Sequence, residues 1–274
     1  MKSLVLLLVG LLALANINSF ANAAFLKVYP AGTTTTATFT DLQTALNTAA
    51  AGDTIQVYGG TYKPSTGDAC GLIMPATATD ITIKGELNNA VYPTYDCEET
   101  NRWMTIDGGT YNTVGGIKIE NINIVNTKTA APISPLRGAG IGFNMAGTSA
   151  NPNYLTNVNI QDSTLIGSGW GDTGGCVDFR SSFVNVQNST FVNCKNQGGK
   201  LSGALYVFGR AANPGYVHFT DSVIDRASGS VGGGVLTEGD QNALFERTTF
   251  SNNFASCCGG AIDDGGSSNT TFKE

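Results

Sequence analysis

Charged residues are scarce in this sequence. Only 13% of the 274 residues are charged, about half the average share of about 25% in soluble domains. The net charge is −6 and lysine and arginine form no cluster, which disfavours a nucleic-acid binder. His218 is the only histidine, and no C-x-x-C spacing occurs, so a zinc site is disfavoured. We therefore expect no metal, no cofactor and no nucleic-acid partner.

Long apolar runs are missing after the N-terminus, so no transmembrane span is predicted. Lys2 precedes a run from Leu4 to Ala15 without polar side chains, which is shorter than the about 20 residues that a bilayer requires. Ala21-Asn22-Ala23 follows as an A-x-A cleavage site. The pattern predicts a signal peptide over 1–23, cleaved after Ala23, and a single domain over 24–274. An uncleaved anchor is the alternative. The expected location is secreted or at the cell surface.

Six cysteines in an exported chain favour disulfide bonds. Six cysteines allow fifteen connectivities, and we favour Cys70 with Cys97 because their region contains no other cysteine. The pairing of the other four stays open. Asn188 and Asn269 begin N-x-T sequons and are candidate glycosylation sites if the source is eukaryotic.

Proline is rare, and the 35 glycines have no period of three, which excludes a collagen triple helix. The glycines instead belong to a repeat. Four similar segments end 26, 33 and 26 residues apart, at Leu165, Phe191, Ile224 and Phe250. Each is followed by a glycine that opens a strand: Gly175, Gly203, Gly234 and Gly260. Because no repeat contains a helix-length stretch, the pattern predicts a parallel β-helix rather than a propeller or leucine-rich repeat.

The first half has less regular strands, at 81–85, 105–109 and 117–125, which alternate with period two. Asparagines near turns are expected at the corners of the coils. One helix is predicted before the strand at 54–58. Thr40 and Gln43 form a capping box, Leu42, Ala45, Leu46 and Ala49 mark an apolar face, and Gly52 ends the helix. This helix would cover the open end of the solenoid.

Residues 41–46, 52–55 and 59–62 resemble the opening of pectin-lyase-like right-handed parallel β-helix proteins. The later coils resemble the chlamydial polymorphic outer-membrane protein repeat, with its Gly-Gly-Ala-(Ile/Leu/Val) and Phe-x-x-Asn signatures. Residues 259–262 and 250–253 match both signatures, whereas Cys194 replaces the asparagine after Phe191. The resemblance implies an all-β, right-handed parallel β-helix with a short N-terminal capping helix.

The pectin-lyase-like superfamily includes lyases, hydrolases and esterases of acidic polysaccharides. The Gly-His-Gly and Arg-Ile-Lys segments of polygalacturonase-type hydrolases are missing, and so is the aspartate and arginine grouping of pectate lyases. Three segments resemble pectin methylesterase motifs in the right order: 161–165, 175–180 and 208–211. That resemblance would make Gln161 the oxyanion stabiliser, Asp162 the acid/base, Asp178 the nucleophile and Arg210 its partner. Ser163 splits the first motif, and the repeat explains the first two motifs without chemistry.

The repeat also predicts a column of outward residues three positions after each glycine: Asp178, Tyr206, Thr237 and Asp263. We expect this column to face solvent and to contact a ligand such as a glycan. One position later, Glu238 and Asp264 would be neighbours on coils about 4.8 Å apart. This separation is close to the about 5–5.5 Å between the carboxyl groups of a retaining glycosidase. If the protein is an enzyme, Glu238, Asp263 and Asp264 are therefore candidate catalytic residues. Solvated acids at a turn are the alternative.

Residues 269–274 align with the start of another coil, so we expect the chain to be a fragment or truncated. The leading functional hypothesis is an exported, non-catalytic β-helix with an adhesive or glycan-binding role, whose partner is a polysaccharide or cell-surface glycan. A carbohydrate-active enzyme on acidic polysaccharide is the alternative. Ice or mineral binding by threonine ladders is weaker, because no regular Thr-x-Thr column repeats over the coils.

Overall fold

The structure is a computed structural model that describes residues 23–32, 39–67, 70–108, 114–130, 138–166, 173–197, 202–210, 214–266 and 268–274. The predicted signal peptide therefore lies outside the described residues except for Ala23, and so does Gly109 of the predicted 105–109 strand. No helix in the described ranges is both long and apolar enough to cross a membrane.

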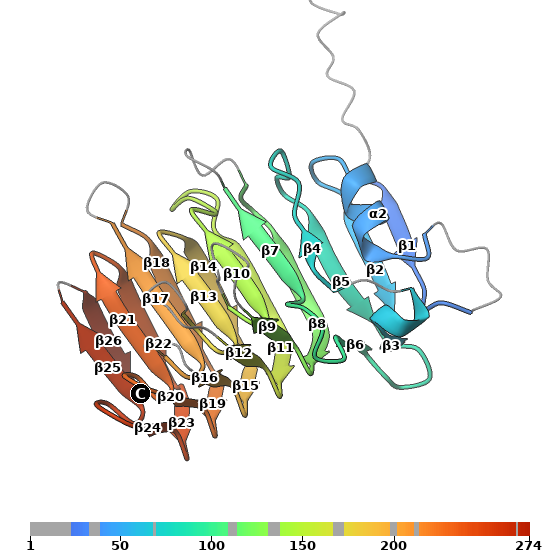
Figure 1. The fold of residues 1–274 in the computed structure, drawn as a ribbon. Helices are drawn as coiled ribbons and strands as arrows, with labels where there is room; N and C mark the ends of the chain where they lie inside the picture. The colour runs from blue at the N-terminus through green and yellow to red at the C-terminus, as the bar shows by residue number, and fades with distance from the viewer. Residues whose placement is uncertain are drawn as a thin grey trace, which may run out of the picture.

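The chain winds into coils whose strands form three parallel sheets (Figure 1). Sheet A contains β1 (Phe25–Val28), β2 (Thr54–Tyr58), β3 (Gly60–Tyr62), β5 (Thr82–Glu86), β6 (Pro93–Asp96), β8 (Lys118–Val125), β11 (Asn153–Gln161), β14 (Phe183–Gln187), β15 (Thr190–Val192), β18 (Tyr216–Thr220), β19 (Val223–Asp225), β22 (Asn242–Glu246), β23 (Thr249–Ser251) and β26 (Asn269–Lys273).

Sheet B contains β4 (Leu72–Ile73), β7 (Met104–Asp107), β10 (Ile141–Asn144), β13 (Val177–Arg180), β17 (Leu205–Gly209), β21 (Val235–Gly239) and β25 (Ile262–Gly265). Sheet C contains β9 (Lys128–Ala130), β12 (Thr164–Ile166), β16 (Lys195–Gln197), β20 (Ser228–Gly229) and β24 (Phe254–Ala255). The fold is thus an all-β parallel β-helix, as predicted. Only two helical segments occur in the described residues, α2 (Leu42–Thr48) and the single 3₁₀ turn η1 (Pro64–Thr66).

The core is built from equivalent residues that stack from one coil to the next. Alternate residues of a strand point to opposite faces, so each strand contributes one inward-facing set. On sheet A, Val186, Phe219 and Phe245 are register partners on successive strands, and all three are buried. The rings of Phe219 and Phe245 stack with centroids 5.0 Å apart, and Phe179 of sheet B approaches Phe219 at 5.9 Å. Coil stacking therefore lines up aromatic rings along the axis.

The corners of the coils depend on residues in the left-handed region of backbone conformation. Asn121, Asn157 and Asn188 adopt φ values of 58°, 53° and 47° where sheet A bends. Asparagine tolerates this conformation better than other non-glycine residues. The Asn157 side-chain N–H also donates to the Asn121 side-chain oxygen of the preceding coil at 2.9 Å. The expectation that asparagines occupy corners is confirmed at these positions.

Helix α2 lies at the N-terminal end of the solenoid, where it packs on β1, β2 and β4 (Figure 1). Leu42, Ala45 and Leu46 are buried, as the predicted apolar face requires. The predicted cap is wrong by one residue, because Asp41 is the N-cap and its carboxylate accepts from the Thr44 N–H at 2.7 Å. Gln43 instead exchanges hydrogen bonds with the Ile73 backbone, which ties the helix to the next turn of chain.

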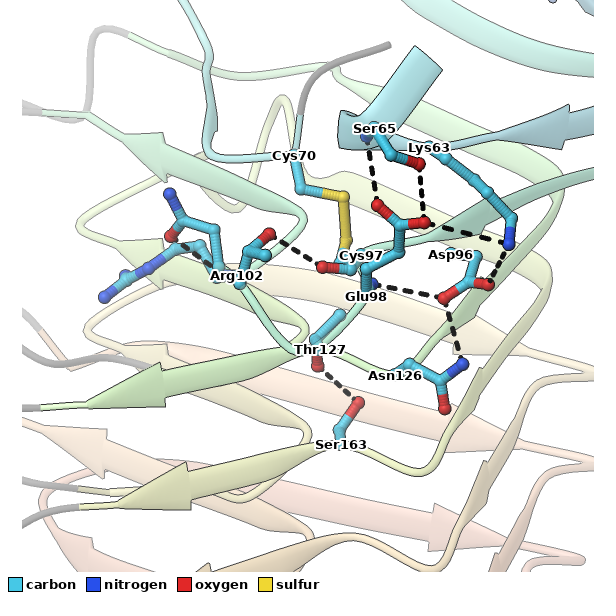
Figure 2. The surroundings of a disulfide bond; sticks show 12 residues. Lys63, Ser65, Cys70, Asp96, Cys97, Glu98, Arg102, Asn126, Thr127 and Ser163 are labelled. Carbon is cyan, nitrogen blue, oxygen red and sulfur yellow. Dashed lines mark hydrogen bonds and ion pairs between the residues drawn. A yellow bond between two sulfur atoms is a disulfide. The ribbon is translucent and has the colours of Figure 1, made fainter. Parts of the chain in front are cut away.

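All six cysteines are paired, as Cys70–Cys97, Cys176–Cys194 and Cys257–Cys258. Cys70–Cys97 is the pair that the sequence favoured, and Figure 2 shows it joining Cys70, just before β4, to Cys97, directly after β6. Beside it, Ser65 donates to Glu98 through both its N–H and its hydroxyl, and Lys63 Nζ lies 3.1 Å from Asp96 Oδ2. The disulfide therefore belongs to a corner that polar contacts also hold.

The core stacking predicts that Phe179→Ala will lower the free energy of unfolding by about 3–5 kcal/mol, because truncation leaves a cavity among packed rings. Phe254→Ala is the matched control, since that ring is 62% exposed, and it should change stability little. Urea denaturation followed by circular dichroism measures both. Equal losses in the two variants would contradict the packing described.

The lengths of chain that the disulfides enclose predict a second difference in stability. Replacing both Cys70 and Cys97 by alanine should lower the free energy of unfolding by about 2–5 kcal/mol, because that bond closes a loop with a sequence separation of 27. Replacing Cys257 and Cys258 by alanine should cost far less, because adjacent residues enclose almost no chain. Denaturation under oxidising conditions compares the two double variants. A larger loss of stability in the Cys257/Cys258 variant would contradict this prediction.

Candidate ligand-binding site on the outer face of sheet B

The strands of sheet B place two columns of side chains on its outer face. The register aligns Asp178, Tyr206, Leu236 and Asp263 in one column, and Arg180, Phe208, Glu238 and Gly265 in the other. Three of the predicted outward residues, Asp178, Tyr206 and Asp263, share the first column. Thr237 does not, because Leu236 occupies its place.

Thr237 is the one residue of the predicted column that the structure places elsewhere. Its side chain is fully buried and belongs to the inward set of β21. The error arises at three consecutive glycines, Gly232 to Gly234. Because Val235 pairs with Leu205, Gly233 and not Gly234 is the equivalent of Gly203. A register shift of one residue moves a side chain to the opposite face of its strand.

The same shift removes the predicted pair of catalytic carboxylates. Glu238 is the register partner of Gly265, whereas Asp264 is the partner of Thr237. The two acids therefore lie on opposite faces of their strands. Asp264 accepts from the Thr237 hydroxyl at 3.0 Å and from the Ser268 hydroxyl. Asp263 accepts from the Gly259 N–H at 3.2 Å, which closes its own turn.

Asp178 is fully buried although it lies on the outer face. It accepts from Arg180 Nε at 3.0 Å and from the Thr173 hydroxyl, which itself accepts from Arg180 Nη2 at 2.6 Å. Burial lowers the pKa of Arg180, but the adjacent Asp178 carboxylate outweighs burial and raises this pKa above its ordinary value. The guanidinium is therefore a permanent, oriented charge, and its side chain is still 19% exposed.

Tyr206 connects this ion pair to Glu238. The Tyr206 hydroxyl donates to Glu238 Oε2 at 2.7 Å, and Arg180 Cζ lies 5.2 Å from the centre of the tyrosine ring. Burial, together with the hydrogen bond to Glu238, raises the pKa of Tyr206. The phenol therefore stays protonated and keeps donating to Glu238. The guanidinium position over the ring adds a cation–π attraction.

An apolar patch completes the cluster. The rings of Tyr206 and Phe208 lie nearly parallel with centroids 6.0 Å apart, and Phe208 and Val231 pack against Tyr206 and Leu236. Phe208 is partly exposed. The outer face of sheet B thus combines the partly exposed Phe208 ring with the Arg180 guanidinium and the Glu238 carboxylate, drawn from three successive coils. Tyr206 is buried like Asp178, so the expectation that their column faces solvent is wrong at both residues. We call Thr173, Asp178, Arg180, Tyr206, Phe208 and Glu238 the sheet B cluster.

The set of residues implied by pectin methylesterases is divided between two sheets. Gln161 is the last residue of β11 in sheet A, where it donates to Asp162 at 2.9 Å, while Asp178 belongs to sheet B. Arg210 follows β17 with an exposed side chain, and its backbone N–H donates to Ser181. The arginine that pairs with Asp178 is Arg180. The structure therefore does not assemble the esterase constellation.

The sequence pattern did not single out Arg180, Phe208 or Thr173. Period-two spacing was an available signal for two of them, since Arg180 and Phe208 lie two residues after Asp178 and Tyr206 on the same strands. Thr173 precedes β13 and had no such signal. Of the remaining candidates, Asn188 is exposed at a corner and Asn269 is exposed at the start of β26.

Within the described residues, no group of three or more histidine, cysteine, aspartate or glutamate side chains is gathered so that it would hold a metal ion. Comparison of the chain with protein families, curated proteins and solved structures gave no match.

The buried ion pair predicts a large cost for removing one partner. Asp178→Asn should lower the free energy of unfolding by about 3 kcal/mol or more, because it removes the carboxylate that pairs with the largely buried Arg180 guanidinium. Asp221→Asn breaks the exposed pair with Arg247, so it should change stability little. Thermal denaturation of both variants tests this difference. A stability of Asp178→Asn equal to that of the parent would contradict the described cluster.

Proposed function

We propose that this protein is an exported, non-catalytic β-helix that binds glycans through the sheet B cluster, in an adhesive or surface role. The observation that carries the proposal is the combination of a partly exposed aromatic ring, Phe208, with the oriented polar groups of Arg180 and Glu238. Binding sites for small polar ligands have this composition, an apolar surface with a few fixed polar groups.

The polar side chains of the cluster are held in fixed orientations, and stabilisation of the fold is a weak explanation for this arrangement. A buried ion pair is a weak stabiliser, because desolvation of both charges offsets their attraction. Asp178 and Arg180 are nevertheless held by Thr173, and Glu238 is held by Tyr206. A preorganised binding site has side chains whose orientation is set by their neighbours. Sugar hydroxyls would meet the Glu238 carboxylate and the Arg180 guanidinium, while the apolar face of a ring would rest on Phe208.

The charge of the cluster favours a neutral glycan. Two carboxylates accompany one guanidinium, and the chain has a net charge of −6. An acidic polysaccharide would approach against this charge. A neutral sugar would meet no electrostatic repulsion, and both the carboxylates and the guanidinium would form hydrogen bonds with its hydroxyls.

Export is supported by two independent features. Residues 1–23 have the pattern of a signal peptide, and three disulfides pair all six cysteines. Structural disulfides persist in oxidising compartments. Asn188 and Asn269 are exposed, so both sequons are open to glycosylation if the source is eukaryotic.

A carbohydrate-active enzyme is the second candidate, and Tyr206 favours it. The Tyr206 hydroxyl orients the Glu238 carboxylate, and an oriented carboxylate is a group suited to general-base catalysis at a saccharide. Turnover would use Glu238 as the base.

Substitutions at the cluster separate binding from catalysis. Phe208→Ala and Glu238→Gln should each weaken binding of neutral oligosaccharides about tenfold, because one removes the apolar contact and the other removes a charged acceptor. Glu246→Gln on sheet A is the matched control and should bind like the parent. Titration calorimetry measures the affinities, and a reducing-sugar assay monitors turnover. Unchanged affinity in both cluster variants would refute the site, and turnover lost in Glu238→Gln would establish the enzyme.

A further inference from the structure

The outer face of sheet A contains a groove that is separate from the sheet B cluster. It has a volume of about 320 Å³ and spans four successive strands, β6, β8, β11 and β15, which lie side by side in Figure 1. One side is a column of four register partners, Thr94, Asn123, Asn159 and Thr190. The other side is formed by the next outward column, Val125, Gln161 and Val192. We call this hollow the amide groove.

Hydrogen bonds along the first column hold its amides in place. Asn159 Nδ2 donates to Asn123 Oδ1 at 2.9 Å, and Asn123 Nδ2 donates to Thr94 Oγ1 at 3.4 Å. Each bond uses one N–H of an amide that has two, and one lone pair of an oxygen that has two. The remaining donor and acceptor positions are therefore oriented by the ladder and are available to a ligand in the groove.

The groove is lined without a charged residue. The acids that continue its second column are paired, Asp96 with Lys63 at 3.1 Å and Asp225 with Arg226 at 3.0 Å. Asp162, which follows Gln161, accepts from the Gln161 side chain at 2.9 Å. Val125 and Val192 add apolar surface between the polar groups. A ligand that matches this lining is uncharged, presents hydroxyls or amides along its edges, and has apolar faces.

The spacing of the coils adds a periodicity to this chemistry. Successive strands lie about 4.8 Å apart, so the groove offers a polar side chain of the first column at every coil, with a valine beside it on β8 and β15. A linear chain of β-linked pyranose rings repeats at nearly the same interval, because one ring is about one coil spacing in length. Consecutive sugar rings would therefore each meet one hydroxyl or amide of the first column.

We propose that the amide groove binds a neutral, linear oligosaccharide along the axis of the β-helix, with one sugar ring on each of the four coils. This site is independent of the sheet B cluster and lies on a different sheet. Two glycan sites on different faces would allow one molecule to bridge two polysaccharide chains, with the gain in avidity that bivalency brings.

The test uses the full chain carrying Phe208→Ala and Glu238→Gln together, which removes both the apolar contact and the charged acceptor of the sheet B cluster. The probes are neutral β-1,4-linked oligosaccharides of glucose, xylose and mannose, from two to six rings, with oligogalacturonates as the charged comparison. Affinity for at least one neutral series should rise up to four rings and then stay constant. Asn159→Ala should weaken that binding about fivefold or more, because it removes the central amide of the ladder.

Asn185→Ala is the matched control, since Asn185 lies on β14 in an outward column of sheet A beyond the groove. It should leave the affinity within about twofold, the size of effect expected for a surface substitution. Circular dichroism checks that both variants are folded. Three results would overturn the proposal: no binding of any neutral series, equal or tighter binding of oligogalacturonates, or equal affinities of Asn159→Ala and Asn185→Ala. None of these depends on whether the sheet B cluster binds glycans.

Discussion

Backbone pairing between successive coils is the constraint on which the rest of this structure depends. Every strand pairing in the three sheets is parallel, so each residue lies over its equivalent in the previous coil. Side chains at equivalent positions of successive coils therefore lie about 4.8 Å apart. Aromatic rings at equivalent positions, such as Phe219 and Phe245, stack on one another and thereby stabilise the core. Like charges would repel at this separation, which is a physical reason for the low charge of the sequence.

The two outer faces satisfy this constraint in different ways. In the amide groove of sheet A, the stacked positions hold neutral amides, and Asn123 and Asn159 bond to one another without any electrostatic cost. On sheet B, adjacent positions hold unlike groups, so that the Arg180 guanidinium lies between Asp178 and the ring of Tyr206. The amide groove thus presents a periodic, neutral surface, whereas the outer face of sheet B presents a single localised cluster. This difference is why a repeating polymer suits the first and a localised contact suits the second.

Much of the fold followed from local pattern. Period-two alternation marked the strands, the spacing of the repeats marked the coils, and asparagine marked corners such as Asn157. The capping helix was predicted in the correct place, although its N-cap is Asp41 and not Thr40, because both residues are competent caps and only the backbone geometry distinguishes them. The Cys70–Cys97 bond followed from spacing, whereas four other cysteines offered no comparable signal.

The sequence by itself determined the class of fold, because periodicity and glycine placement act locally and need no knowledge of distant residues. Only the tertiary structure decided which outward side chains meet. Tyr206 and Glu238 are 32 residues apart, and their hydrogen bond depends on which of three consecutive glycines opens β21. A shift of one residue at that point sends Thr237 inward and separates Glu238 from Asp264. Register is a property of paired backbones, so side-chain pattern alone left it ambiguous wherever glycine removed the side chains.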